Sequence, residues 1–304
     1  VEGVKLLNVD PGKATNRTVV TFVGTPEEVI DAAFLAIKKA SELIDMSKHS
    51  GEHPRMGATD VCPLVPIANI EMDEVVKYAH KLGERVGKEL GIPGYFYEYA
   101  ASTEERRNLA VVRKGEYEAL KAKLVDPQWQ PDFGPAEFVK AKHTGATAIS
   151  ARDFLIAYNV NLNTTSTRRA NAVAYDIREK GRIKRVGEVL SGDIVKDANG
   201  NTLWTPGKLK HVKAIGWFIE EYGVTQVTMN ITNITKTPLH LAFDETAKAA
   251  NARGIRATGS ELVGLVPKSA MLEAGKYFLR KQNRSTGIHE SELIKIAIKS
   301  MGLD

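Results

Sequence analysis

The sequence predicts an α/β protein built from two units. Stretches rich in β-branched residues alternate with amphipathic stretches whose apolar residues recur every three or four positions, a pattern typical of sheets covered by helices. The length of 304 residues exceeds what one hydrophobic core usually organises and indicates two units of about 150 residues. With 43% hydrophobic and 26% charged residues, the composition is that of a soluble globular protein. No stretch approaches the roughly 18 apolar residues of a membrane span, and nothing at the N-terminus resembles a signal peptide.

The first predicted elements are two strands and a helix. Residues 4–9 and 17–23 are rich in β-branched residues, and Asp10-Pro11-Gly12 between them indicates a turn. The helix is expected from Pro26 to about Asp45, because Thr25 can cap it and Glu28 completes a capping box. Its apolar positions are expected to face a sheet; they are Val29, Ala33, Ala36, Ile37, Ala40, Leu43 and Ile44.

A second strand–helix–strand series follows. Residues 61–67 are expected to form a buried strand, and their two prolines indicate an edge position or an irregular strand end. Residues 73–90 form an amphipathic pattern that stops at Gly91, and residues 95–99 alternate aromatic side chains as a strand does. The charged stretches 104–107 and 113–124 are expected to be helical, solvated surface.

Residues 127–145 have neither a helical nor a strand period. They hold three prolines, two glycines, two phenylalanines and a tryptophan. A long irregular stretch inside a compact domain is uncommon and often functional. A packed linker between domains is the plainer alternative.

The second half of the chain repeats the alternation of strands and helices. Strands are expected at residues 154–162, 224–234 and 262–266, with a strand or short helix at 212–221. Helices are expected at residues 167–180, 237–250, 268–279 and 290–301. Residues 183–208 are hydrophilic, with a turn at 197–201, and predict a hairpin or excursion. Thr237-Pro238 repeats the capping device of Thr25-Pro26.

Charge and cysteine content narrow the classes of function. The 42 basic and 37 acidic residues give a formal charge of +5, and no dense basic block is interleaved with aromatics. Nucleic acid is therefore not an expected partner, whereas an anionic small molecule suits the mild basic excess. Cys62 is the single cysteine, which excludes an internal disulfide and fits a reducing cytoplasm. We expect Cys62 to be a small buried residue and not a nucleophile.

The densest group of ionisable residues lies in the loop at residues 49–63. Gly51, Pro54 and Gly57 stop helices there, so the polar residues His49, Glu52, His53, Arg55 and Asp60 lie on a loop. A solvated connection is the plain reading of such a loop. Two histidines four apart can share a metal ion only on a continuous helix, so no metal site is expected. General acid/base chemistry fits better, because an imidazole titrates near neutral pH and the neighbouring charges can orient it.

Several stretches resemble the glutamate formiminotransferase family. The loop supplies residues 44–49 (IDMSKH), 51–58 (GEHPRMGA) and 60–63 (DVCP). Further stretches agree nearly end to end: residues 10–24 (DPGKATNRTVVTFVG), 113–120 (RKGEYEAL), 131–135 (PDFGP), 154–162 (FLIAYNVNL) and 259–267 (GSELVGLVP).

The resemblance implies two subdomains, residues 1–149 and 150–304, each with a mixed β-sheet and helices packed on one face. A cleft or tunnel is expected between them. Chains of the family usually begin with another strand and helix, so the first subdomain is expected to lack these elements. The resemblance is to the formiminotransferase domain, and the cyclodeaminase domain of some family members is not expected within these residues.

The resemblance also implies a reaction in one-carbon metabolism and histidine catabolism. A formimino group would pass between N-formimino-L-glutamate and tetrahydrofolate, the co-substrate, in a homodimer. The helix-breaking residues of the loop and the single cysteine separately predict that no metal is bound and that the chain is cytoplasmic. His53 occupies the family's acid/base position. Arg17 and Arg55 are candidates for binding carboxylates, and Asp10 and Asp60 for orienting an imidazole or stabilising the adduct.

The family's folate-contacting segment maps onto residues 134–145. The candidates there, with Phe133 as a further possible ring, are Gly134, Pro135, Phe138, Lys140, Lys142, His143 and Gly145. Flat rings can stack on the pterin, and cations can meet the glutamate carboxylates. Lys142 and His143 form an insertion relative to the family pattern. Two alternatives remain: a related folate enzyme for formyl transfer or folate cyclisation, and a folate-binding protein without catalysis.

Overall fold

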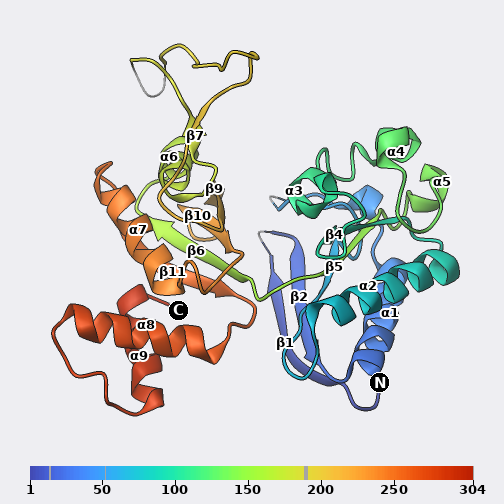
Figure 1. Ribbon diagram of the computed structural model, residues 1–304, viewed down its shortest axis with the longest axis horizontal. Coiled ribbons are helices and arrows are strands. Elements are labelled where there is room, and N and C mark those ends of the chain that lie inside the picture. Colours follow the sequence, from blue (N-terminus) through green and yellow to red (C-terminus); the bar gives the residue numbers. More distant parts are fainter. Residues whose placement is uncertain (14, 52, 188–190, 304) are drawn as a thin grey trace. The chain divides into compact units, whose positions relative to one another are not determined.

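Contacts between residues divide the chain into two units, Val1–Asp153 and Phe154–Asp304. The computed structural model describes residues 1–13, 15–51, 53–187 and 191–303, coloured along the chain in Figure 1. Each unit has its own strands, helices and hydrophobic core, which confirms the predicted α/β class. Among the described helices, none combines the length and apolar character that a membrane crossing requires.

The first unit contains an antiparallel strand pair, a parallel sheet and surrounding helices. Its strands are β1 (Lys5–Gly12), β2 (Arg17–Val23), β3 (Val61–Leu64), β4 (Gly94–Glu98) and β5 (Thr147–Ala151). Its α-helices are α1 (Pro26–Leu43), α2 (Met72–Arg85), α3 (Leu109–Val112), α4 (Leu120–Val125) and α5 (Phe138–Ala141). Single helical turns lie at η1 (Met46–Lys48), η2 (Val86–Leu90), η3 (Glu105–Arg107) and η4 (Pro127–Trp129).

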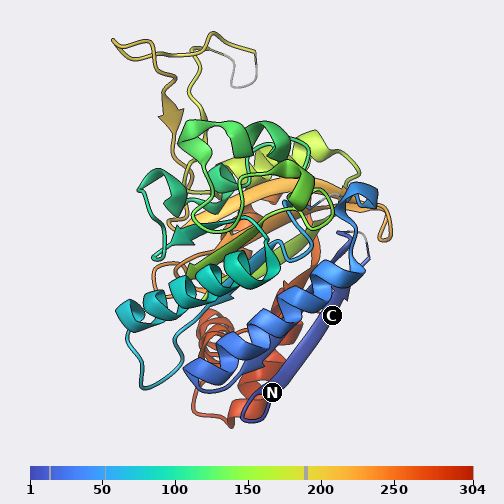
Figure 2. The same cartoon turned by 90° about the vertical axis from the view of Figure 1, so that its right-hand side faces the viewer.

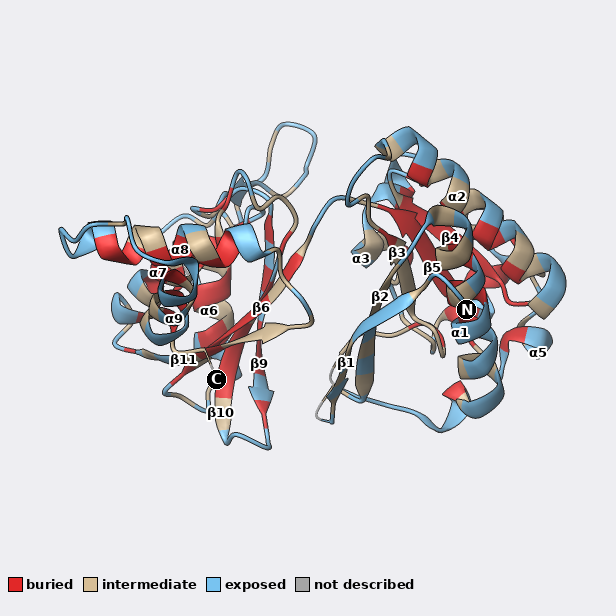
Figure 3. Cartoon of the chain, turned by 90° about the horizontal axis from the view of Figure 1, so that it is seen from below, coloured by how far each residue is buried: buried red, intermediate tan, exposed pale blue. Residues whose placement is uncertain are grey.

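The parallel sheet has the strand order β3-β5-β4, so β3 lies at an edge as its prolines predicted. Side chains alternate across β4. Phe96 joins the core formed with α1 and α2, which lie side by side in Figure 2. Tyr95 and Tyr97 join a second cluster with α3, α4 and α5. Figure 3 shows the resulting buried layer, with the outward faces of the helices exposed.

Three local expectations for the first unit were wrong. The turn does not begin at Asp10, because β1 continues to Gly12 and Pro11 pairs with Thr18 of β2; an edge strand tolerates this proline. α1 begins at Pro26 as predicted, but within the described part of the chain Thr25 makes no side-chain capping bond. The buried face of α1 is also shifted from the predicted one: Ile30 and Phe34, which were not predicted, are buried, whereas Ala36 and Leu43 are exposed.

The second unit is an antiparallel sheet packed against helices. Its strands are β6 (Ile156–Leu162), β7 (Arg182–Ile183), β8 (Trp204–Thr205), β9 (Val212–Ile219), β10 (Val224–Ile231) and β11 (Ala257–Val263). Its helices are α6 (Thr167–Ile177), α7 (Leu239–Asn251), α8 (Lys268–Lys281) and α9 (Glu290–Met301). The main sheet has the order β11-β6-β10-β9, so the ambiguous stretch at 212–221 is a strand.

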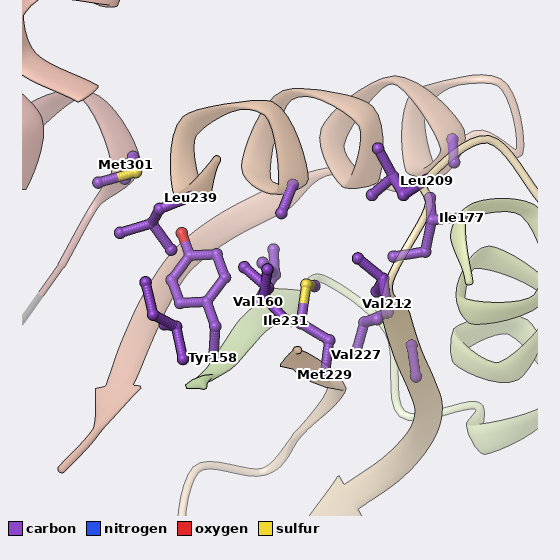
Figure 4. Packing of buried hydrophobic residues seen from close by; sticks show 14 of the residues in the cluster. Tyr158, Val160, Ile177, Leu209, Val212, Val227, Met229, Ile231, Leu239 and Met301 are labelled. Carbon is purple, nitrogen blue, oxygen red and sulfur yellow. The ribbon is translucent and has the colours of Figure 1, made fainter. Parts of the chain in front are cut away.

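Alternation along the strands builds the core of this unit. Tyr158 and Val160 of β6 and Val227 and Met229 of β10 point to one side, where Leu239 of α7 packs on them (Figure 4). The predicted hairpin is confirmed, because β7 pairs with β8. The described residues between these two strands, 184–187 and 191–203, extend from the rest of the second unit in Figure 1. The prediction that Thr237 caps α7 as a repeat of Thr25-Pro26 was wrong, because Pro238 is the N-cap of α7 and the Thr237 hydroxyl donates to the Lys210 carbonyl.

Candidate functional site

The histidine loop, residues 49–60, lies against residues 143–148 of the same unit. Backbone hydrogen bonds join Ala58 N to Thr144 O at 2.7 Å and Ala146 N to Met56 O at 3.1 Å. Gly57 and Gly145 face each other in an isolated bridge. The loop and the end of the 134–145 segment, which the sequence identified separately, are therefore neighbours. Glu52 lies outside the described residues.

Two glycines permit this close approach. A Cβ atom on Gly145 would lie 2.2 Å from the Met56 carbonyl oxygen, and one on Gly57 would lie 2.2 Å from the Ala146 carbonyl oxygen. Gly145 also has a φ of +67°, which disfavours any residue with a side chain. The two backbones can pass at this distance only because both positions lack a side chain.

His53 is held by its own loop and by β2. Its Nδ1 lies 2.8 Å from the Pro54 carbonyl oxygen. Arg17 Nη1 lies 2.8 Å from the same Nδ1 and 3.1 Å from Nε2. A carbonyl oxygen can only accept and a guanidinium can only donate, so the tautomer that satisfies both groups carries the proton on Nδ1 toward Pro54 and the lone pair on Nε2 toward Arg17.

The surroundings of His53 favour its neutral form. The pKa of His53 is lowered to about 4, chiefly by burial and next by the positive charge of Arg17. The Pro54 carbonyl and Asp60 oppose this shift. At neutral pH the side chain is therefore an uncharged imidazole able to accept a proton.

Asp60 joins two arginines beneath the histidine. Its Oδ2 accepts a hydrogen bond from Arg113 Nη1 at 2.5 Å and lies 3.3 Å from Arg17 Nη1. Its Oδ1 accepts from the backbone of Met56 at 2.9 Å. The Asp60 side chain is only 10% exposed, so this carboxylate compensates two partly buried cations. Asp60 therefore supports both the loop and Arg17.

Arg113 is a site residue that the sequence reasoning assigned to solvated surface, and this assignment was wrong. Its Nη1 also donates to the Pro54 carbonyl at 3.1 Å, the oxygen that His53 approaches. Its side chain is 13% exposed. The sequence feature that could have identified Arg113 was its position at the start of the 113–120 stretch that resembles the family.

Arg55 is engaged by acidic residues of the same motif. Its Nη2 lies 2.6 Å from a Glu118 carboxylate oxygen, and its Nη1 lies 3.1 Å from Glu116. These hydrogen bonds raise the pKa of the guanidinium, with Glu118 as the main cause. Arg55 therefore fastens the histidine loop to residues 116–118.

The remaining loop candidates lie at the periphery. His49 is exposed, with Nδ1 3.3 Å from the Asn16 side chain. Asp10 is half-buried on β1, in register with Val19. Within the residues that the structure describes, no group of three or more His, Cys, Asp or Glu side chains is arranged to hold a metal ion. Burial raises the pKa of the Cys62 thiol to about 12, which keeps it a poor nucleophile.

The segment at residues 127–145 is less irregular than expected, because it contains η4 and α5. Phe133 is 6% exposed and packs 5.1 Å from the ring of Phe96, in the core. Phe138 is half-buried, 6.2 Å from the ring of Tyr117. The two rings therefore differ, and only Phe138 retains an accessible face.

The basic residues of this segment lie on the surface. Lys140 pairs with Glu137 at 3.1 Å, and His143 Nδ1 lies 3.6 Å from Asp45. Lys142 is exposed, and its carbonyl accepts from Tyr117 Oη at 2.5 Å. Pro135 is half-buried beside Gly134, whose Cβ would meet the Ile92 carbonyl at 2.3 Å. Residues 134 and 145 are thus fixed by backbone packing, whereas the cations between them face solvent.

Two buried cations anchor the start of the segment, and both were wrongly expected to be solvated. Arg106 donates to the Gln128 and Gln130 carbonyls and pairs with Asp132 at 2.7 Å. Lys123 donates to the Val112 carbonyl and lies 4.1 Å from the ring of Trp129. Burial lowers the pKa of Lys123 to about 8.

Comparison with known proteins covers both units. Residues 1–152 match the family model of the formiminotransferase domain, N-terminal subdomain, and residues 157–304 match that of the formiminotransferase domain. The chain is 48% identical over 302 residues to a formimidoyltransferase-cyclodeaminase of Gallus gallus, covering 99% of this chain and 52% of that protein. It therefore spans about half the length of the first such curated relatives.

Shorter relatives match over most of their length. The chain is 40% identical over 300 residues to a glutamate formimidoyltransferase of Thermoplasma acidophilum, covering 98% of this chain and 90% of that protein. A glutamate formimidoyltransferase of Streptococcus pyogenes is 39% identical over 283 residues, covering 93% of this chain and 86% of that protein.

Proposed function

The chain belongs to the formiminotransferase domain family, and from this premise we propose that it transfers a formimino group between N-formimino-L-glutamate and tetrahydrofolate. The products are 5-formiminotetrahydrofolate and L-glutamate, and the reaction can run in either direction. The observation that carries the proposal is a neutral, Arg17-bound His53 in a loop that matches the family signature. No metal takes part in the proposed chemistry.

The reaction requires one proton to move between two nitrogen atoms. The folate nitrogen attacks the formimino carbon, and the new C–N bond gives a tetrahedral adduct. A proton leaves the attacking nitrogen, and the glutamate nitrogen receives one as its bond to the carbon breaks. His53 serves as the shuttle through Nε2, because Nδ1 is engaged by the Pro54 carbonyl. Nδ1 keeps the ring in one orientation during both steps.

Arg17 is proposed to bind a substrate carboxylate and so adjust His53. The guanidinium lowers the pKa of His53 in the free chain. A carboxylate placed beside Arg17 would offset that charge and move the pKa of His53 back toward neutrality, where proton transfer in both directions is most efficient. Asp60 and Arg113 hold Arg17 and the loop in place for this contact. Asp10 is assigned an orienting role, and Arg55 fixes the loop.

The folate is proposed to lie along residues 134–145. Phe138 offers a ring face, and the backbone at Gly134, Pro135 and Gly145 gives the segment a fixed path. Lys140, Lys142 and His143 are exposed cations that can meet the carboxylates of the glutamate tail. This arrangement, apolar at one end and cationic at the other, matches the chemistry of a folate.

A spectrophotometric assay tests the proposal. The chain is incubated with tetrahydrofolate and either N-formimino-L-glutamate or N-formyl-L-glutamate, and formation of the substituted folate is followed. We expect faster turnover of the formimino donor. Faster turnover of the formyl donor would favour the related folate enzyme, and binding of folate without turnover of either donor would favour a binding protein.

The proposed setting is a homodimer in the cytoplasm. The single cysteine, Cys62, is compatible with a reducing compartment. Light scattering after size-exclusion chromatography tests the oligomeric state, and a mass of about one chain would contradict it.

A further inference from the structure

A small cavity at the base of the β7–β8 hairpin is lined by three arginines. Its volume is about 270 Å³, and its lining is Asp176, Arg182, Ile183, Arg185, Thr205 and Arg253. Three guanidinium groups face one carboxylate, which leaves a formal excess of two positive charges. All six residues belong to the second unit, so the cavity shares no residue with the histidine loop.

Among the described residues, the hydrogen bonds that hold these arginines do not use all their donors. Asp176 accepts hydrogen bonds from Arg182 Nη2 and, at 2.6 Å, from Arg253 Nε. Arg182 Nη2 also donates to the Ala172 carbonyl, and Arg185 Nη1 donates to the Gly192 carbonyl at 2.6 Å. A guanidinium has five N–H donors, so each arginine retains donors beyond these bonds.

Like charges gathered around a hollow repel one another unless an anion compensates them. Asp176 compensates only part of the charge. The planar fork of arginine matches carboxylate and phosphate oxygens, and clusters of arginine recur where proteins recognise such groups. Arg182 lies on β7, Arg185 lies in the hairpin that follows it, and Arg253 lies in the turn after α7, so the fold brings the two hairpin cations together with one that is distant in sequence.

We propose that this cavity is a binding site for a small oxyanion bearing phosphate or carboxylate groups. Its volume lies below the roughly 300–1,000 Å³ of pockets that bury a drug-sized ligand. A small dianion with part of its hydration shell fits this space, and a whole folate does not. Thr205 in the lining can add a hydroxyl donor. The proposal is independent of the formimino transfer.

Isothermal titration calorimetry of the whole chain with inorganic phosphate, and separately with succinate, tests the site at low salt. We expect saturable binding of at least one of the two anions, and the tighter one identifies the preferred group. Added sodium chloride should weaken the binding, because screening reduces the attraction of a partly open site. Absence of saturable binding of both anions would overturn the proposal.

Three variants separate a ligand site from a clamp that only fastens the hairpin. Arg185→Met should weaken anion binding roughly tenfold, the effect of losing one charged hydrogen bond. Asp176→Asn should tighten it severalfold, because the internal anion that competes for the arginines loses its charge. Lys184→Met removes an exposed charge from the same hairpin and should leave the affinity unchanged.

The direction of the Asp176→Asn effect is decisive. A clamp built on the Asp176 ion pairs would make this variant bind anions no better than the parent, and that result would overturn the proposal. Equal weakening by Arg185→Met and Lys184→Met would also overturn it, because the attraction would then be general surface charge. Circular dichroism of each variant confirms that the fold is retained.

Discussion

Acidification should destabilise the first unit through His53. The pKa of His53 in the folded chain is lowered to about 4 from 6.5, chiefly by burial and then by Arg17. Between these two pH values the unfolded chain binds a proton that the folded chain does not, so the free energy of unfolding falls as pH decreases. The difference of about 2.5 pH units, at about 1.4 kcal/mol per unit, gives a loss of about 3 kcal/mol. This loss of stability is complete near pH 4, and above pH 6.5 there is no loss.

Urea unfolding of the parent and of His53→Gln between about pH 7 and pH 4 measures this effect. Other titrating groups contribute equally to both proteins, so the difference between their pH dependences isolates His53. His49→Gln is the matched control, since His49 is exposed in the same loop, and it should follow the parent. Parallel curves for the parent and His53→Gln, within about 0.5 kcal/mol, would refute the burial argument.

Three further predictions follow from the site. Gly145→Ala should lower the free energy of unfolding by about 3 kcal/mol, because its Cβ would meet the Met56 carbonyl at 2.2 Å in addition to the strain of the positive φ. The control Gly91→Ala, with a φ of +64° but open space around it, should cost only about 1 kcal/mol. Equal losses for the two variants in thermal unfolding would contradict the close approach. Activity should survive exhaustive chelation, and elemental analysis finding one tightly held metal per chain, lost in His49→Ala, would reverse this. Lys140→Ala combined with Lys142→Ala should weaken the binding of folates with several glutamates more than that of folates with one, and added salt should reduce the difference. Unchanged affinities at low salt would mean that the glutamate tail binds at other residues.

The order of strands and helices could be predicted from the sequence because it depends on local patterns of residues. Apolar spacing placed α2, α8 and α9, and the prolines of residues 61–67 placed β3 at an edge. The start of the β1–β2 turn was misplaced for the same reason, since the rule that reads Asp10-Pro11-Gly12 as a turn ignores pairing with a neighbouring strand. Tertiary contacts override such local preferences.

The burial of charged residues could not be predicted from the local sequence. Arg106, Lys123 and Arg113 stand in stretches that look like solvated surface, yet each is held inside the first unit by distant carbonyls or carboxylates. Whether a cation is buried depends on partners that are remote in sequence, as with Asp60 for Arg113. The sequence could therefore identify the histidine loop and Asp60, but not that Arg113 supports them.

The decisive measurement is the turnover of His53→Ala beside the parent, with tetrahydrofolate and N-formimino-L-glutamate varied in turn. Loss of a positioned acid/base should lower kcat roughly 10²- to 10⁴-fold while KM changes much less. His49→Ala, four residues away and exposed, should retain the kcat of the parent. Equal kcat for His53→Ala and the parent would contradict the role of His53 in the transfer.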